Sequence, residues 1–226
     1  MLNVFLLSLA VGFSGAIIPG PLLAVTINQA LRFGWTAGLW IALGHAVTEL
    51  VLVGGLRAGL GGLLQRRWVR RIIGTIGGVV LLYFAWGMFA TALDASALAA
   101  AQDSRVVASR LGLFGVGVLL TVTQPYWYLW WATAGVGLIA AQSEQHGTRA
   151  WPAFYVGHIL ADILWYVIVS TLIALGRGFM SPAVHRAIIL VCAVGVAVLG
   201  VYFLYRQYAE WRDARKAPPA LEPIVE

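Results

Sequence analysis

Gly44-His45-Ala46-Val47-Thr48-Glu49-Leu50 and Gly157-His158-Ile159-Leu160-Ala161-Asp162-Ile163 share one pattern. In both stretches Gly-His is followed by three residues, then an acid and an aliphatic residue. The two copies start 113 residues apart, at positions 44 and 157, which is half of the 226-residue chain. Each copy lies in an apolar run long enough to cross a bilayer as a helix. The repetition predicts a chain of two similar helical halves.

The composition indicates a membrane protein. Hydrophobic residues make up 61% of the chain and charged residues only 11%, whereas soluble domains carry about 25% charged residues. The formal net charge of +6 comes from basic residues that lie between apolar runs, so we expect a lipid bilayer as a partner and no nucleic acid. The single cysteine, Cys192, excludes an internal disulfide.

The apolar runs predict six membrane spans, because a spanning helix needs roughly 20 mostly apolar residues. The expected fold class is all-α, a polytopic membrane protein with a single membrane domain over residues 1–226. Residues 209–226 form a polar C-terminal tail in this prediction. The spans are expected at about residues 3–30, 36–60, 69–92, 111–140, 151–176 and 184–207.

The two halves are predicted to be inverted repeats. Residues 1–100 and 105–208 would each hold three spans, and an odd number of spans places the second half upside down relative to the first. Proline interrupts the first span of each half, at Ile18-Pro19-Gly20-Pro21 and at Thr123-Gln124-Pro125-Tyr126. Corresponding breaks of this kind are typical of secondary transporters that bind substrate near the middle of the membrane.

Basic residues predict the orientation, because cytoplasmic loops are rich in Lys and Arg. With six spans, both termini lie on the side that holds ten basic residues, and the other side holds five. We therefore expect a multi-pass protein of the cell inner membrane with both termini in the cytoplasm. The ten are Arg57, Arg66, Arg67, Arg70, Arg71, Arg149, Arg206, Arg212, Arg215 and Lys216.

Only two of the nine acids, Glu49 and Asp162, lie inside predicted spans. An acid in mid-membrane costs at least ~2.5–3.5 kcal/mol, so it usually faces a cavity or a partner. His45 and His158 precede these acids by four residues, which places each pair on one helix face. We predict that the four residues couple transport to protons or bind a cation. A structural His–acid pair between helices and a divalent metal site are the alternatives, although no Cys ligand or His-rich loop supports a metal.

The proline breaks predict a substrate site. A helix interrupted in lipid exposes backbone groups, which is tolerated where they line a cavity, and the start of a half-helix attracts an anion. The candidate substrate-binding residues lie at the two breaks and beside them. They are Pro19, Gly20, Pro21, Gln29, Gln124, Pro125 and Trp127. The aromatic run from Tyr126 to Trp131 would form a cation–π wall or a packing surface.

Ile17-Ile18-Pro19-Gly20-Pro21, followed by Gly34-Trp35-Thr36-Ala37-Gly38 and Gly44, resembles the LysE-type amino-acid exporter family. The resemblance covers about the whole chain. The family typically has Asn-Pro at the second break, where this chain has Gln124-Pro125. The resemblance implies export of amino acids or similar small metabolites, driven by the proton gradient. It leaves the particular substrate open.

The sequence therefore predicts a proton-coupled secondary transporter, and a transporter of metal ions or other cations is the alternative. The chain shows no nucleophile arrangement and no cofactor fingerprint, so we expect neither an enzyme nor a bound cofactor. The sequence leaves the oligomeric state open, a homodimer included.

Overall fold

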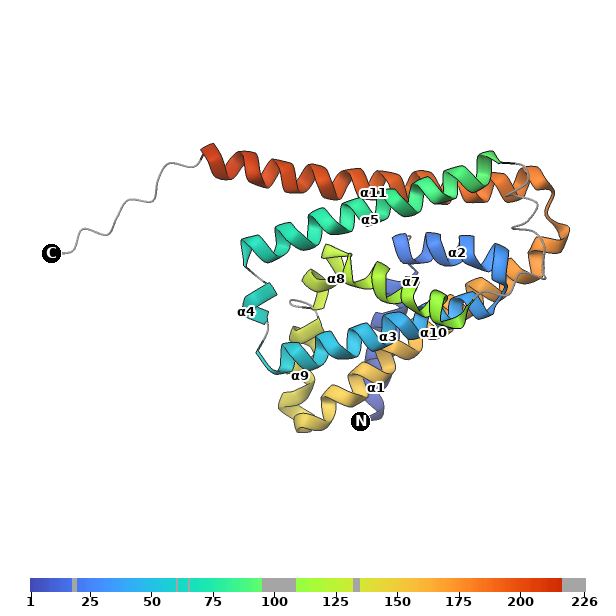
Figure 1. Ribbon diagram of the computed structural model, residues 1–226. Helices are drawn as coiled ribbons and strands as arrows, with labels where there is room; N and C mark the ends of the chain where they lie inside the picture. The colour runs from blue at the N-terminus through green and yellow to red at the C-terminus, as the bar shows by residue number, and fades with distance from the viewer. Residues whose placement is uncertain (18–19, 60, 65, 95–108, 132–134, 217–226) are drawn as a thin grey trace.

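The structure is a computed structural model, and it describes residues 1–17, 20–59, 61–64, 66–94, 109–131 and 135–216. Within these ranges the regular structure is entirely helical (Figure 1). The helices in chain order are α1 (Leu2–Ala16), α2 (Pro21–Phe33), α3 (Thr36–Arg57), α4 (Gly61–Leu64), α5 (Arg67–Leu93), α7 (Arg110–Val122), α8 (Pro125–Trp130), α9 (Val136–His146), η2 (Gly147–Arg149), α10 (Ala150–Gly176), η3 (Arg177–Phe179) and α11 (Pro182–Lys216).

Four helical segments in the described part of the chain are long and apolar enough to cross a membrane. They are α3, α5, the run from Val136 to Phe179 that contains α10, and α11. The pair α1 and α2 adds a fifth if both helices belong to one bent span. The prediction of an all-helical, multi-pass chain is therefore confirmed. The fourth predicted span, at 111–140, begins on α7, an apolar helix of only 13 residues.

Both predicted interruptions coincide with helix ends. Helix α1 ends at Ala16 and α2 begins at Pro21, and their axes differ by 76°. Helix α7 ends at Val122 and α8 begins at Pro125. Proline accounts for both starts, because it lacks the N–H that continues a helix but suits the first helical turn. The interrupted span expected over 111–140 consists of α7, α8 and α9.

Two predicted boundaries differ from the structure. The segment between the spans expected at 111–140 and 151–176 is helical, since α9 runs to His146 and η2 joins it directly to α10. The last helix continues to Lys216, beyond the expected end at 207. The last turns of this helix carry charged residues, which hydropathy assigns to a polar tail. Charged side chains are nevertheless compatible with a helix that continues outside the membrane. Residues 217–226 of the predicted tail lie outside the described residues.

The helices pack in three close pairs: α1 with α10, α3 with α7, and α5 with α11. Figure 1 shows α5 and α11 lying side by side along much of their length. Helix α3 also packs on α10, so the two Gly-His helices are neighbours. This arrangement brings the repeated motifs together.

Glycines allow these close approaches. A Cβ atom on Gly44 would overlap the carbonyl oxygen of Phe114 in α7, and one on Gly117 would overlap the carbonyl oxygen of Ile41 in α3. The α1–α10 pair uses glycine in the same way. A Cβ on Gly157 would lie 2.5 Å from the carbonyl oxygen of Phe5, far inside ordinary contact. The glycine of each Gly-His motif therefore sets the distance between two helix backbones, as small residues do in membrane bundles.

Candidate functional site

Both Gly-His helices and both interrupted segments contribute to one cavity of about 480 Å³. This volume lies within the range of small-molecule binding sites. The described residues that line the cavity include no Lys or Arg. Its polar lining consists of Ser14, His45, Glu49, Thr121, Gln124, His158 and Asp162, and its aromatic lining of Trp127, Trp130, Trp131, Tyr166, Tyr202 and Phe203.

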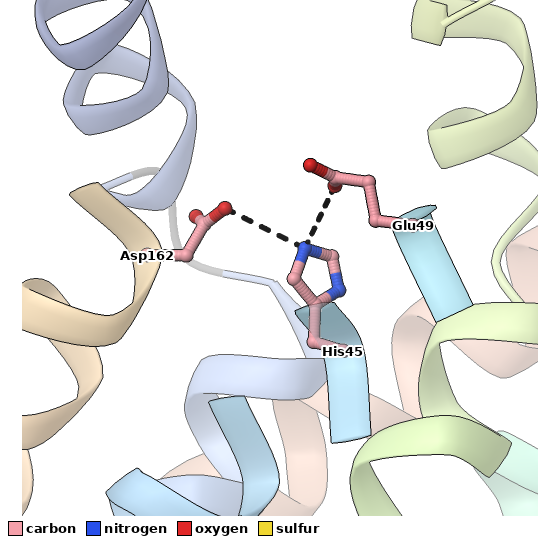
Figure 2. A group of neighbouring side chains, drawn as sticks. All are labelled: His45, Glu49 and Asp162. Carbon is pink, nitrogen blue, oxygen red and sulfur yellow. Dashed lines mark ion pairs between the residues drawn. The ribbon is translucent and has the colours of Figure 1, made fainter. Parts of the chain in front are cut away.

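A histidine joins the two intramembrane acids at this cavity. The Nε2 atom of His45 lies 3.1 Å from Oε2 of Glu49 and 3.5 Å from Oδ2 of Asp162. Figure 2 shows this single nitrogen facing both carboxylates. Glu49 is fully buried, and His45 and Asp162 are 8% and 5% exposed. The His–acid pair of α3 is thus extended by the acid of α10 into one buried cluster.

The local fold explains this geometry. His45 and Glu49 are one helical turn apart on α3, so their side chains lie on the same face. Asp162 reaches them because α3 and α10 approach closely. At Gly38 of α3, an added Cβ would overlap the carbonyl oxygen of Tyr166 and the hydroxyl of Ser170. Without that glycine the backbones could not approach this closely.

His158, the counterpart of His45, has different surroundings. Its Nε2 lies 3.9 Å from both Glu49 Oε1 and Asp162 Oδ2, which is beyond hydrogen-bonding distance. Its ring is nearly parallel to that of Phe154, with a 12° interplanar angle, and lies 4.9 Å from the Trp130 ring. Both histidines of the repeat therefore lie near the acids, but only His45 lies within hydrogen-bonding distance of a carboxylate oxygen.

Two further side chains hold the cluster in place. The Nδ1 atom of His45 lies 2.9 Å from Oγ1 of Thr121 on α7. The indole Nε1 of Trp127 on α8 donates a hydrogen bond of 3.2 Å to Oε2 of Glu49. Buried oxygens remain available, because Oε1 of Glu49 and Oδ2 of Asp162 accept no hydrogen bond from the described residues.

The structure brings together most of the residues predicted for the site. The four predicted coupling residues line the cavity, and so do Gly20, Pro21, Gln124 and Trp127. Gln29 is half-buried on α2 and is not among the lining residues. Pro125 starts α8, but its side chain lies outside the described residues, as does Pro19 altogether.

Thr121 lines the cavity and contacts His45, and sequence reasoning missed it. The only sequence signal is its place one turn before Pro125, on the segment that the break interrupts. Tyr166 was missed as well, although it follows Asp162 by four residues and so shares its helix face. Neither residue type is unusual in an apolar helix, so the pattern gave no reason to select it.

The site has the chemistry of a binding pocket for a cation or a proton. Two carboxylates and a histidine lie within contact of each other in a cavity whose described lining offers no permanent positive charge. Two buried carboxylates side by side are stable in a membrane only if a proton or a bound cation compensates their negative charge. A multi-pass helical protein with this pocket at its interrupted helices has the features of a secondary transporter.

Comparison with known proteins identifies the family. The profile of the LysE type translocators matches residues 13–207, so the chain belongs to this family. Members of the family are transporters and not enzymes. The family resemblance inferred from the proline and glycine motifs is confirmed.

Individual relatives agree with this assignment. The chain is 30% identical to the arginine exporter protein ArgO of Shigella flexneri, over 83% of this chain and 84% of that protein. It is 29% identical to ArgO of Serratia proteamaculans, over 89% and 95% of the two chains. It is 20% identical to the putative amino acid efflux protein YcgF of Bacillus subtilis, over 91% and 97%. No solved structure matches the chain.

Proposed function

We propose that this protein exports amino acids from the cytoplasm in exchange for protons, and that its preferred substrates carry a cationic side chain. The observation that carries the proposal is the buried contact of His45 with Glu49 and Asp162 in the cavity. Relatives named as arginine exporters and as an amino acid efflux protein support the substrate class.

The cavity offers what a cationic side chain needs. Glu49 Oε1 accepts no hydrogen bond from the described residues, and Asp162 Oδ2 has only the 3.5 Å ion pair with His45, so a guanidinium or ammonium group can donate to both oxygens. The aromatic rings of Trp127 and Trp130 line the same space, and such rings favour a cation through their π electrons. The absence of Lys and Arg from the described lining avoids repulsion.

The carboxylate of an amino acid would lie at the interrupted helix of the first half. Helix α2 begins at Pro21, and its first intrahelical bond runs from the Ala24 N–H to the Gly20 carbonyl. The N–H of Leu22 precedes that bond, and Leu22 lines the cavity. Free N–H groups and the helix dipole favour an anion there. Gln124 lines the cavity from the second interruption and can add a hydrogen bond.

Coupling follows if proton and substrate compete for the same carboxylates. With a cation bound, both acids are ionised, and with the site empty, at least one of them must be neutralised by a proton. The site then changes its access from one side of the membrane to the other with either substrate or protons bound, which is the requirement for exchange. A proton returning to the cytoplasm can thereby drive an amino acid outward.

The helix packing supports an inverted repeat as the basis of alternating access. In the proposed repeat, α1 corresponds to α7 and α10 corresponds to α3. The packed pair α1 and α10 is therefore equivalent to the packed pair α7 and α3, and each pair is in contact through the glycine of a Gly-His motif. The pairs α5 with α11 and α3 with α10 map onto themselves. Six spans with both termini in the cytoplasm, as the basic loops predict, complete this proposal.

Transport by the purified protein tests the proposal. Proteoliposomes loaded with labelled arginine should release it when the external medium is acidified, and unlabelled external amino acids should not be required. The double variant Glu49→Gln, Asp162→Asn should lose this proton-driven release. Glu144→Gln, which neutralises an exposed acid on α9, is the matched control and should retain it. Undiminished proton-driven release by the double variant would contradict the coupling role.

Transport of divalent cations as cargo is the second candidate. One observation favours it: donor atoms of His45, Glu49 and Asp162 all lie within 4.8 Å of one another. We assign no metal here, because the same atoms already pair as histidine and carboxylate. Uptake of labelled Mn²⁺ or Zn²⁺ by the proteoliposomes, lost in His45→Ala, would favour this candidate over amino-acid export.

A further inference from the structure

The hydroxyl of Thr121 can accept a hydrogen bond from His45 but cannot donate one to it. Thr121 Oγ1 donates its proton to the carbonyl oxygen of Gly117, at 2.7 Å. A hydroxyl has only one proton, so at 2.9 Å from His45 Nδ1 the threonine oxygen is the acceptor. His45 must therefore carry a proton on Nδ1.

This assignment determines what the other ring nitrogen does. With Nδ1 protonated, Nε2 either bears the second proton of an imidazolium or presents a lone pair. Nε2 faces carboxylate oxygens of Glu49 and Asp162. A lone pair directed at an ionised carboxylate is repulsive, so a proton is needed between them.

We propose that Thr121 is a positioning residue that fixes His45 so that its Nε2 is the atom that carries the transported proton between Glu49 and Asp162. The inference rests on the proposed function, and it adds the atom that carries the proton and the residue that selects it. Thr121 belongs to α7, which ends one residue later at Val122 where the second interruption begins. The proton carrier is thus anchored to a segment next to the break.

The proton transfer balances without a further reactant. When Nε2–H of the imidazolium gives its proton to a carboxylate, the N–H bond breaks, an O–H bond forms, and both charges disappear. The ring is left neutral, with its remaining proton on Nδ1 and still donated to Thr121. In the reverse direction the Nε2 lone pair takes the proton from either acid. Nδ1–H is unchanged throughout, so only one nitrogen exchanges protons.

The titratable groups around His45 are few. Glu49 comes from its own helix, and Asp162 and His158 come from α10. Tyr166 of α10 lines the same cavity, while the hydroxyl of Tyr155 is already donated to the carbonyl oxygen of Ala46. The described neighbours from α7 and α8, Thr121 and Trp127, do not titrate near neutral pH.

His158 provides an internal comparison. Its Nδ1 is buried and has no hydrogen-bond partner among the described residues. Its Nε2 is too far from either acid for a hydrogen bond. The pseudo-equivalent histidine therefore lacks the anchor that gives His45 a defined tautomer, and we expect it to contribute little to proton transfer.

Three variants, two at Thr121 in α7 and one at Thr123 just after this helix, test the role of the hydroxyl. Thr121→Val keeps the side-chain shape but removes the acceptor, and Thr121→Ser restores it. Thr123→Val is the matched control, because the Thr123 hydroxyl also donates its proton to a carbonyl oxygen of α7, that of Leu119 at 2.7 Å. Thr121→Val should slow proton-driven release roughly fivefold, the equivalent of one neutral hydrogen bond. Its pH profile should move to lower pH, since the imidazolium loses an acceptor.

Two results would support the inference and two would overturn it. Rescue of rate and pH profile by Thr121→Ser, with Thr123→Val near wild type, supports it. Equal loss in Thr121→Val and Thr123→Val, or an unshifted pH profile in Thr121→Val, overturns it. Neither of the overturning results affects the proposed function, which fails only if the double carboxylate variant remains coupled.

Nitrogen NMR provides a readout that does not depend on transport. In protein labelled with ¹⁵N-histidine, the His45 signals are identified by their loss in His45→Gln. The neutral ring should be the Nδ1–H tautomer in the wild type and in Thr121→Ser. A neutral ring protonated at Nε2 in the wild type would overturn the inference, whether or not Thr121→Val folds.

Discussion

Replacing Trp127 with phenylalanine removes one hydrogen bond from Glu49 while keeping an aromatic ring in the cavity wall. The indole N–H donates to Oε2 of Glu49 at 3.2 Å, and that carboxylate is fully buried. The bond favours the ionised carboxylate, because a protonated carboxyl group is the weaker acceptor. Its loss should therefore make Glu49 hold a proton up to higher pH.

The structure sets the size of the effect. Hydrogen bonds to charged groups contribute roughly 1.5–3 kcal/mol, and 3.2 Å is the long end of the N–H···O range. We take the lower value, about 1.5 kcal/mol. Because 1.36 kcal/mol corresponds to one pH unit, the midpoint of the pH profile of proton-driven release should rise by about one unit in Trp127→Phe. This direction is opposite to that expected for Thr121→Val.

The assay is arginine release from proteoliposomes over a series of external pH values. Trp165→Phe is the control, since the Trp165 indole N–H has no hydrogen-bond partner among the described residues. Its pH profile should match that of the wild type. A Trp127→Phe profile that is unshifted, or shifted to lower pH, would refute the argument that the indole stabilises ionised Glu49.

Two further predictions concern packing and the two histidines. Gly157→Ala brings a Cβ to 2.5 Å from the Phe5 carbonyl oxygen, so thermal unfolding in detergent should show that the free energy of unfolding falls by about 1–3 kcal/mol. Gly195→Ala is the control and should leave the stability unchanged, because there is open space around Gly195. Equal stability of the two variants would contradict the packing argument. His45→Asn should reduce proton-driven release roughly a hundredfold, as expected for loss of a proton-transfer group. His158→Asn should reduce it much less. Equal losses in the two variants would show that the two rings act alike.

The local features of this protein could be predicted from the sequence. The apolar runs predicted an all-helical membrane chain, and the prolines predicted where α2 and α8 begin. The spacing of His45 and Glu49 placed both on one face of α3. Each of these features depends on residues within a few turns of each other, where the helix period fixes the geometry.

Other local predictions were wrong for an equally local reason. Hydropathy left the residues between the spans at 111–140 and 151–176 outside any helix, yet they are helical, because polar residues are compatible with a helix as well as with a turn. The end of α11 was placed at 207 for the same reason, although the helix continues to Lys216. Hydropathy reports the extent of apolar surface and not the extent of the helix.

Only the tertiary structure decided which side chains meet across helices. The repeated motif made His45 and His158 equivalent candidates, but in the structure the first is hydrogen-bonded to Thr121 and the second lies among aromatic rings. Contacts between helices depend on where glycines such as Gly44 and Gly38 let two backbones approach, and no period along one helix encodes its partner. The helices and their breaks were thus determined by the sequence alone, whereas the bridging of two acids by one histidine required the packed helices.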